Sequence, residues 1–203
     1  MSKLAILGGE PLRTKPFVYT PYFDDAEKNA MLEVFDRRLL SGFYEDYRTG
    51  GPALQRFERA FADYHGMKYG IGVNSGTAAL HAALVGVGVG PGDEVIVTSY
   101  TFTASASSIL MCNAIPVFCD VDKNTFNMDA KKIESLITPK TKAILAVHLL
   151  GNPSDMDEIM QVANKYNLKV VEDVAQSPGA LYNRKLVGTI GDVSAFSFVE
   201  TKN

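Results

Sequence analysis

The chain has 203 residues, of which 46% are hydrophobic and 21% charged, and this ordinary composition fits one large globular domain or two small ones. The formal net charge of −3 gives no basic excess that would indicate a nucleic-acid partner. Because Gly, Asn and Ser interrupt the longest uncharged stretches, the sequence also predicts no membrane span.

The two cysteines, Cys112 and Cys119, show neither a metal-ligand nor a redox spacing. A metal site is therefore not expected. Free cysteines are typical of a reducing compartment, so the sequence predicts a cytoplasmic location.

The first part of the chain is predicted to be helical. Apolar residues recur at helical spacing over residues 31–39 and again over 54–64, where Gly66 ends the second stripe. We expect residues 1–66 to form an N-terminal helical segment that packs on a larger domain made of residues 67–203.

From residue 69 onward, predicted strands and helices alternate. Strands are expected at 69–73, 93–99, 115–121, 142–149 and 168–173, and helices between them at 75–88, 103–113, 128–137 and 154–167, the last capped by Ser154. A hairpin around residues 183–185 and one more strand are expected to follow. This alternation predicts an α/β fold with a mainly parallel sheet and helices on both faces.

In such a sheet, functional side chains are expected at the carboxyl ends of the strands. Ser75, Gly76 and Thr77 follow the first predicted strand and begin a helix, where free N–H groups form an anion site. The alternative is that Ser75 or Asn74 only caps the helix.

Three further strand ends carry candidate residues. Phe102 could lie flat against a planar ligand or belong to the core. Asp173 ends a very apolar strand, where a carboxylate needs a cation or hydrogen-bond donors, unless it caps the following turn. Lys202 is either a solvated lysine or a covalent handle, with Glu172 as a solvated neighbour.

Combined, these residues describe one ligand, pyridoxal 5'-phosphate (PLP). Lys202 would form the Schiff base as a neutral amine, and Asp173 would keep the pyridine nitrogen protonated. Ser197 would join the Ser75–Thr77 turn at the phosphate. The protein would supply orientation and electrostatics while the cofactor carries the chemistry.

The order of motifs also resembles a known family. The segments NSGTAAL (74–80), GDEVIVTSYTFTASA (92–106), VVEDVAQSPGA (170–180) and GDVSAFSFVETKN (191–203) are similar to those of the DegT/StrS-like sugar aminotransferases. These are PLP enzymes with the aspartate-aminotransferase fold, also called fold type I. The resemblance implies these cofactor-binding residues: Ser75, Gly76, Thr77, Phe102, Asp173, Gln176, Ser197 and Lys202.

The resemblance assigns a role to each position. Lys202 is implied to be the covalent lysine and the catalytic acid and base, and Asp173 the partner of the pyridine nitrogen. Gln176 is implied to lie near the ring hydroxyl, and Phe102 to stack on the ring. The remaining residues are implied to hold the phosphate.

The implied reaction moves an amino group from Glu or Gln to a nucleotide-linked keto-sugar or a keto-cyclitol, in a homodimer. Family chains continue well beyond this length. We therefore expect this chain to be the cofactor-binding half, without the small C-terminal domain, and to be inactive alone.

Three alternatives stay open. Related sugar dehydratases carry His in place of the lysine, so Lys202 favours amination. A non-catalytic PLP-binding or regulatory relative would keep the same residues. A nucleotide-binding domain is disfavoured, because no G-x-G-x-x-G follows the first strand. His148 could line the pocket, although a structural role is favoured.

Overall fold

The computed structural model describes residues 3–15, 23–38 and 50–202, which fall into two compact units, Met1–Leu40 and Ser41–Asn203. In the first unit, a short 3-10 helix, η1 (Ala5–Leu7), precedes α1 (Asp25–Asp36). Asp24 and Glu27 form a reciprocal capping box that starts α1. The predicted helix over 31–39 is thus confirmed as far as Asp36, while Leu39 lies outside the described residues.

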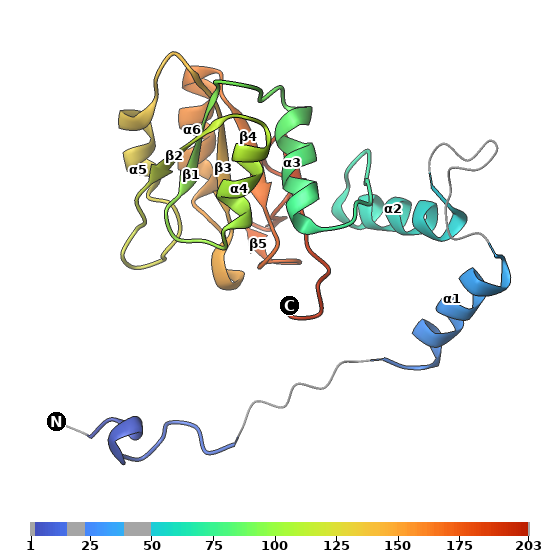
Figure 1. Ribbon diagram of the computed structural model, residues 1–203. Helices are drawn as coiled ribbons and strands as arrows, with labels where there is room; N and C mark the ends of the chain where they lie inside the picture. The colour runs from blue at the N-terminus through green and yellow to red at the C-terminus, as the bar shows by residue number, and fades with distance from the viewer. Residues whose placement is uncertain (1–2, 16–22, 39–49, 203) are drawn as a thin grey trace. The chain divides into compact units, whose positions relative to one another are not determined.

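The second unit contains the sheet (Figure 1). Its elements in chain order are α2 (Pro52–His65), α3 (Gly76–Gly86), β1 (Glu94–Thr98), α4 (Ala104–Met111), β2 (Ile115–Cys119), α5 (Ala130–Ile133), η2 (Glu134–Leu136), β3 (Thr141–Val147), η3 (Leu149–Gly151), α6 (Met156–Tyr166), β4 (Lys169–Asp173), β5 (Leu181–Tyr182), β6 (Lys185–Leu186) and β7 (Val193–Ala195). None of the helices in the described ranges has the length and apolar content that crossing a bilayer requires.

Five of the described strands form one parallel sheet in the order β2-β1-β3-β4-β7. Asp173 at the end of β4 is paired with Val147 of β3 on one side and with Ala195 of β7 on the other. All these strands therefore deliver their carboxyl ends to one edge. The predicted parallel α/β architecture is confirmed.

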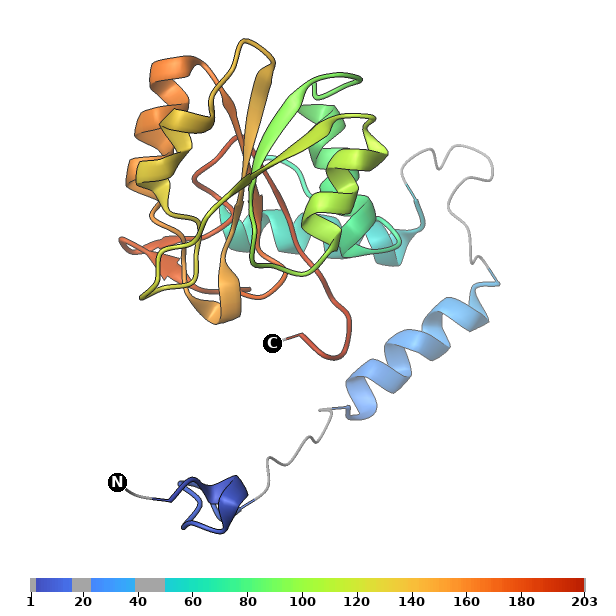
Figure 2. The same cartoon turned by 60° about the vertical axis from the view of Figure 1, so that its left-hand side comes forward.

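Helices cover both faces of the sheet. Figure 2 shows α3 and α4 on one side and α5 and α6 on the other. One core cluster joins α3 and α4 to inward-facing strand residues such as Val97 and Leu145, and the other joins α5 and α6 to residues such as Ile144. Strands that are covered on both faces favour apolar residues at most positions, which explains the apolar runs in their sequences.

The predicted strand at 69–73 is wrong, because this segment is extended but belongs to no ladder in the described structure. Tyr69 and Ile71 are exposed, while Gly70 and Gly72 face α2. A side chain at Gly70 would meet the backbone of Glu58, and Glu58 accepts a bond from the N–H of Gly72. Alternation alone predicts an extended segment, whereas a strand also needs a partner.

Local capping differs from expectation at one helix. Asp155, not Ser154, caps α6 by accepting the N–H of Glu158. Ser154 is buried and donates its hydroxyl to the carbonyl of Val147 at 2.7 Å. The prediction that Ser154 caps this helix is therefore wrong, because its hydroxyl is bonded to the end of β3 instead.

The remaining turn predictions are confirmed. Gly66 ends α2 in the left-handed conformation. The hairpin of β5 and β6 turns at Asn183 and Arg184, which both have positive φ, as the tight turns of two-residue hairpins require.

Candidate functional site

The candidate site lies at the edge where β1, β4 and β7 end. Phe102 follows β1 and is 64% exposed, and the Nζ atom of Lys202 lies 5.5 Å from the centre of its ring. Asp173 ends β4 beside Ala195, and Ser197 stands two residues beyond Ala195. The fold thus brings together Phe102 and Lys202, which are 100 positions apart in the sequence.

The start of α3 approaches the segment after β7 very closely. A Cβ atom built on Gly76 would lie 3.1 Å from the Cβ of Ser197 and 3.4 Å from its hydroxyl oxygen. Ser75 caps α3 by accepting the N–H of Ala78 at 3.1 Å, so the capping alternative is correct for this residue. The first turn of α3 thus lies directly against Ser197, and the N–H groups at the start of a helix are suited to an anion.

Asp173 is a nearly fully buried carboxylate with few donors. One oxygen accepts the N–H of Ala175 at 3.1 Å and the other accepts the hydroxyl of Ser105 at 2.9 Å. Burial raises the pKa of Asp173, and the bonds from Ala175 and Ser105 and the charge of Lys202 oppose that rise only in part. The turn-capping alternative holds for one oxygen, while the other faces α4.

The adjacent Glu172 has the opposite environment. It is also fully buried, but it accepts bonds from the N–H groups of Gly188, Ile190 and Gly191 and from the ring of His148. Burial pushes its pKa upward, yet the bonds from His148, Gly191 and Gly188 prevail and leave the pKa lowered. The expectation of a solvated Glu172 is wrong.

His148 serves the structure rather than the pocket. It is fully buried, its Nδ1 atom accepts the N–H of Ser154, and its Nε2 atom lies 3.0 Å from Glu172. Because Nδ1 is an acceptor, the proton sits on Nε2 and is donated to the carboxylate. No short sequence motif predicts the pairing of His148 with Glu172, because the two residues are 24 positions apart.

Gln176 contacts the loop after β3. Its Oε1 atom accepts the N–H of Leu150 at 3.1 Å. Leu150 has a φ of 52° and an exposed side chain, so a strained residue is held at the same edge as Asp173. The structure thus places Gln176 at the site's edge, next to a loop that could shape it.

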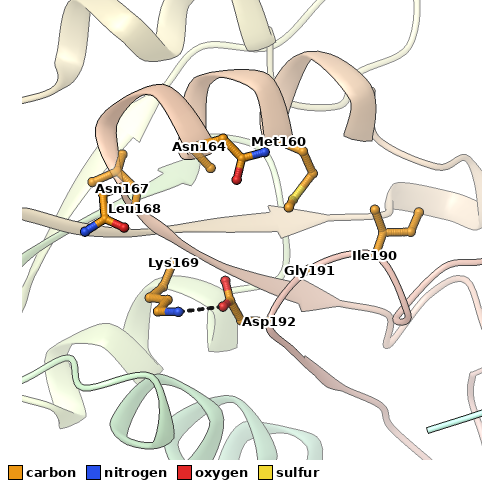
Figure 3. A pocket seen from close by; sticks show the side chains of 9 residues that line it. Met160, Asn164, Asn167, Leu168, Lys169, Ile190, Gly191 and Asp192 are labelled. Atoms are coloured by element: carbon orange, nitrogen blue, oxygen red, sulfur yellow. Dashed lines mark hydrogen bonds and ion pairs between the residues drawn. The ribbon is translucent and has the colours of Figure 1, made fainter.

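A shallow hollow of about 200 Å³ lies elsewhere, where α6 ends and β4 begins (Figure 3). Lys169 and Asp192 lie in its wall and pair with each other at 2.8 Å. Asp192 also accepts the N–H of Val170, so its charge is used in joining the start of β4 to the loop before β7. Asn164 and Asn167 also line this hollow, and none of the candidate site residues is among the residues that line it.

Comparisons with known proteins identify the relatives of this chain. The model of the DegT/DnrJ/EryC1/StrS aminotransferase family matches residues 25–203. GDP-perosamine synthase of Caulobacter vibrioides is 49% identical over 91% of this chain and 48% of its own length. L-glutamine:2-deoxy-scyllo-inosose aminotransferase of Streptomyces fradiae is 43% identical over 100% of this chain and 47% of its own.

Among solved structures, NtdA of Bacillus subtilis with bound cofactor PMP superimposes with a TM-score of 0.76 at 35% identity, covering 93% of this chain and 43% of that one. The chain spans about half the length of the curated relatives it matches.

Proposed function

The chain belongs to the DegT/DnrJ/EryC1/StrS aminotransferase family, and from this premise we propose that it carries the cofactor site of a PLP-dependent aminotransferase. The proposed reaction moves an amino group to a keto-sugar or a keto-cyclitol. The single observation that carries the proposal is the buried Asp173. Within the described residues it accepts hydrogen bonds only from Ser105 and Ala175, and the charge of Lys202 acts on it.

The residues present fit PLP in charge and shape. A buried carboxylate with few donors is stabilised by a cation, and a protonated pyridine nitrogen is such a cation. The donor set of Gly76, Thr77 and Ser197 suits a phosphate. When bound, the cofactor supplies an aldehyde that an amine can attack and a ring that withdraws electrons.

Each side chain then has a defined task. Lys202 would attach the cofactor through its neutral amine and would move a proton at the α-carbon of the amino donor. Phe102 would contact the ring, and Gln176 would help to hold its hydroxyl. Asp173 would keep the ring nitrogen protonated.

The names of the relatives support a substrate class. The Streptomyces relative is named for L-glutamine and an inosose, and the Caulobacter relative for a GDP-linked sugar. We infer glutamine, or else glutamate, as donor and a nucleotide-linked keto-sugar or keto-cyclitol as acceptor. We also infer a homodimer in the cytoplasm, which the exposed apolar side chains Tyr69, Ile71 and Phe198 and the two free, buried cysteines support.

Covalent trapping tests the proposal. The 203-residue chain is incubated with PLP, reduced with borohydride and digested, and the modified lysines are mapped by mass spectrometry. Lys202 should be labelled at far lower PLP concentrations than the exposed Lys131 and Lys140. Lys202→Ala should remove this preferential label, whereas Lys140→Ala should leave it unchanged. Equal labelling of all three lysines would overturn the proposal.

A non-catalytic, PLP-binding relative is the second candidate. It would give the same label at Lys202 but would not convert PLP to its aminated form when glutamine or glutamate is added. That conversion changes the absorbance of the cofactor. Applied to the whole protein, the absorbance measurement separates an aminotransferase from a regulatory relative.

A further inference from the structure

A chain of hydroxyl groups reaches Asp173 from the loop that carries Phe102. The hydroxyl of Ser105, in the first turn of α4, lies 2.9 Å from Oδ2 of Asp173 and 3.0 Å from the hydroxyl of Thr101. Ser105 is fully buried, and its backbone N–H donates to the carbonyl of Phe102 at 3.1 Å. Ser105 therefore contacts both the loop of the stacking residue and the acid.

The direction of these bonds follows from the chemistry of the groups. An ionised carboxylate is only an acceptor, so Ser105 must donate its single proton to Asp173. Thr101 must then donate its proton to the oxygen of Ser105. The bond from Thr101 polarises the hydroxyl of Ser105, and this strengthens the hydrogen bond that Ser105 donates to Asp173.

The position of Ser105 leaves the rest of the carboxylate available. Ser105 approaches Oδ2 from α4, while Ala175 approaches Oδ1 from the chain just after β4. With both oxygens held from the protein side, the carboxylate cannot rotate freely. The contrast with Glu172, which accepts four bonds, shows that Asp173 keeps acceptor capacity for a ligand.

We propose that Ser105, supported by Thr101, is a positioning residue that orients the carboxylate of Asp173 and keeps it ionised for a cationic ring nitrogen. This inference rests on the proposed PLP site. It adds that Ser105 fixes the position of Phe102 relative to Asp173, because Ser105 bonds to both residues.

The first test needs no cofactor. The titration of the Asp173 carboxyl carbon is followed by NMR in the cofactor-free chain. Ser105→Ala should shift the midpoint of that titration upward, because the ionised form loses a donor. Ser107→Ala is the matched control, since Ser107 lies on the same helix and, in the described structure, its hydroxyl donates to the carbonyl of Ala104.

The second test measures PLP affinity by the fraction of Lys202 trapped with borohydride at increasing PLP concentrations. Ser105→Ala should weaken binding about tenfold or more, the cost of one hydrogen bond to a charged group. Thr101→Val should weaken it by a smaller factor, whereas Thr101→Ser, which keeps the hydroxyl, should match the wild-type chain.

The outcomes separate this inference from the proposed function. A wild-type chain without preferential label at Lys202 would overturn the PLP site itself. A labelled wild-type chain whose Ser105→Ala variant titrates and binds like the Ser107→Ala variant would overturn the positioning role alone. A raised titration midpoint of Asp173 with unchanged PLP affinity would also overturn the positioning role, because the Ser105 hydroxyl would then affect Asp173 only in the cofactor-free protein.

Discussion

At the scale of single residues, the neighbours Glu172 and Asp173 show how environment decides the role of a carboxylate. Successive side chains of a strand point to opposite faces, so the two acids enter different surroundings. Glu172 meets the loop before β7 and His148, whereas Asp173 meets α4. Glu172 stabilises the fold. Asp173 destabilises the cofactor-free fold, and a bound cation would offset this loss of stability.

Replacing Glu172 tests the first role. Glu172→Gln places an amide NH₂ against backbone N–H donors, so we expect unfolding free energy to fall by about 3 kcal/mol or more. Denaturant unfolding measures this loss. Glu134→Gln is the control, because Glu134 pairs with Lys165 at the surface and should matter little.

The pH dependence of the same variant has a defined sign. Since the folded-state pKa of Glu172 is lowered from 4.5, its contribution is complete above about that pH and disappears as pH falls through the lower folded value. The stability difference between wild type and Glu172→Gln should therefore be constant near neutrality and shrink in acid. A difference that persists unchanged at low pH would contradict the charged role of Glu172.

Asp173→Asn tests the second role. The folded-state pKa of Asp173 is raised, so the ionised side chain destabilises the cofactor-free fold at neutral pH. We expect Asp173→Asn to raise the melting temperature of the cofactor-free chain and to abolish preferential PLP labelling at Lys202. A lowered melting temperature would mean that the carboxylate already has stronger partners.

At the scale of elements, the site depends on how α3 and the segment after β7 meet. Phe196 and Phe198 lie on either side of Ser197 and pack edge-on against Phe61 of α2, with ring centres 4.9 and 5.4 Å apart. This packing holds the segment in place. Gly76 then permits the backbone of α3 to approach Ser197.

Two glycines of α3 give a matched pair of variants. Gly76→Ala introduces a Cβ atom 3.1 Å from Ser197, so we expect PLP labelling at Lys202 to need about tenfold more PLP, the equivalent of 1.4 kcal/mol. Gly86→Ala meets no atom within 4 Å and should leave labelling unchanged while stabilising the helix. Equal labelling curves for the two variants would show that the close approach is unimportant for binding.

At the scale of the whole molecule, protection from solvent is uneven in the second unit. The strands β1, β3 and β4 lie inside the sheet between two helical layers. Residues 69–73 instead run along α2, and within the described ranges only the N–H of Gly72 among them has an acceptor. Such segments open at low free-energy cost.

Hydrogen exchange measured by mass spectrometry should resolve this difference. Amides of β3 should exchange slowest, because Ala143, Ile144 and Leu145 are buried and paired on both sides. Amides of residues 69–73 should exchange within the fastest group of the second unit. Protection of 69–73 comparable to that of β3 would show that a partner strand covers them in solution.

Local chemistry explains which features could be read from the sequence. The alternation of apolar strands with helices indicated the parallel α/β fold, and Ser75 and Gly66 act within one turn of their own position. The strand-end rule located Phe102 and Asp173 because all parallel strands end at one edge. These inferences need no knowledge of distant contacts.

Only the tertiary structure decided what each polar group bonds to. Ser105 donates a hydrogen bond to Asp173, which lies 68 residues further along the chain. Ser154 donates its hydroxyl to the carbonyl of Val147 instead of capping α6. Residues 69–73 have a strand-like pattern, yet they pair with no strand in the described part of the chain. The free energy of a buried polar group depends on its donors, and those donors come from segments that the sequence order does not place beside it.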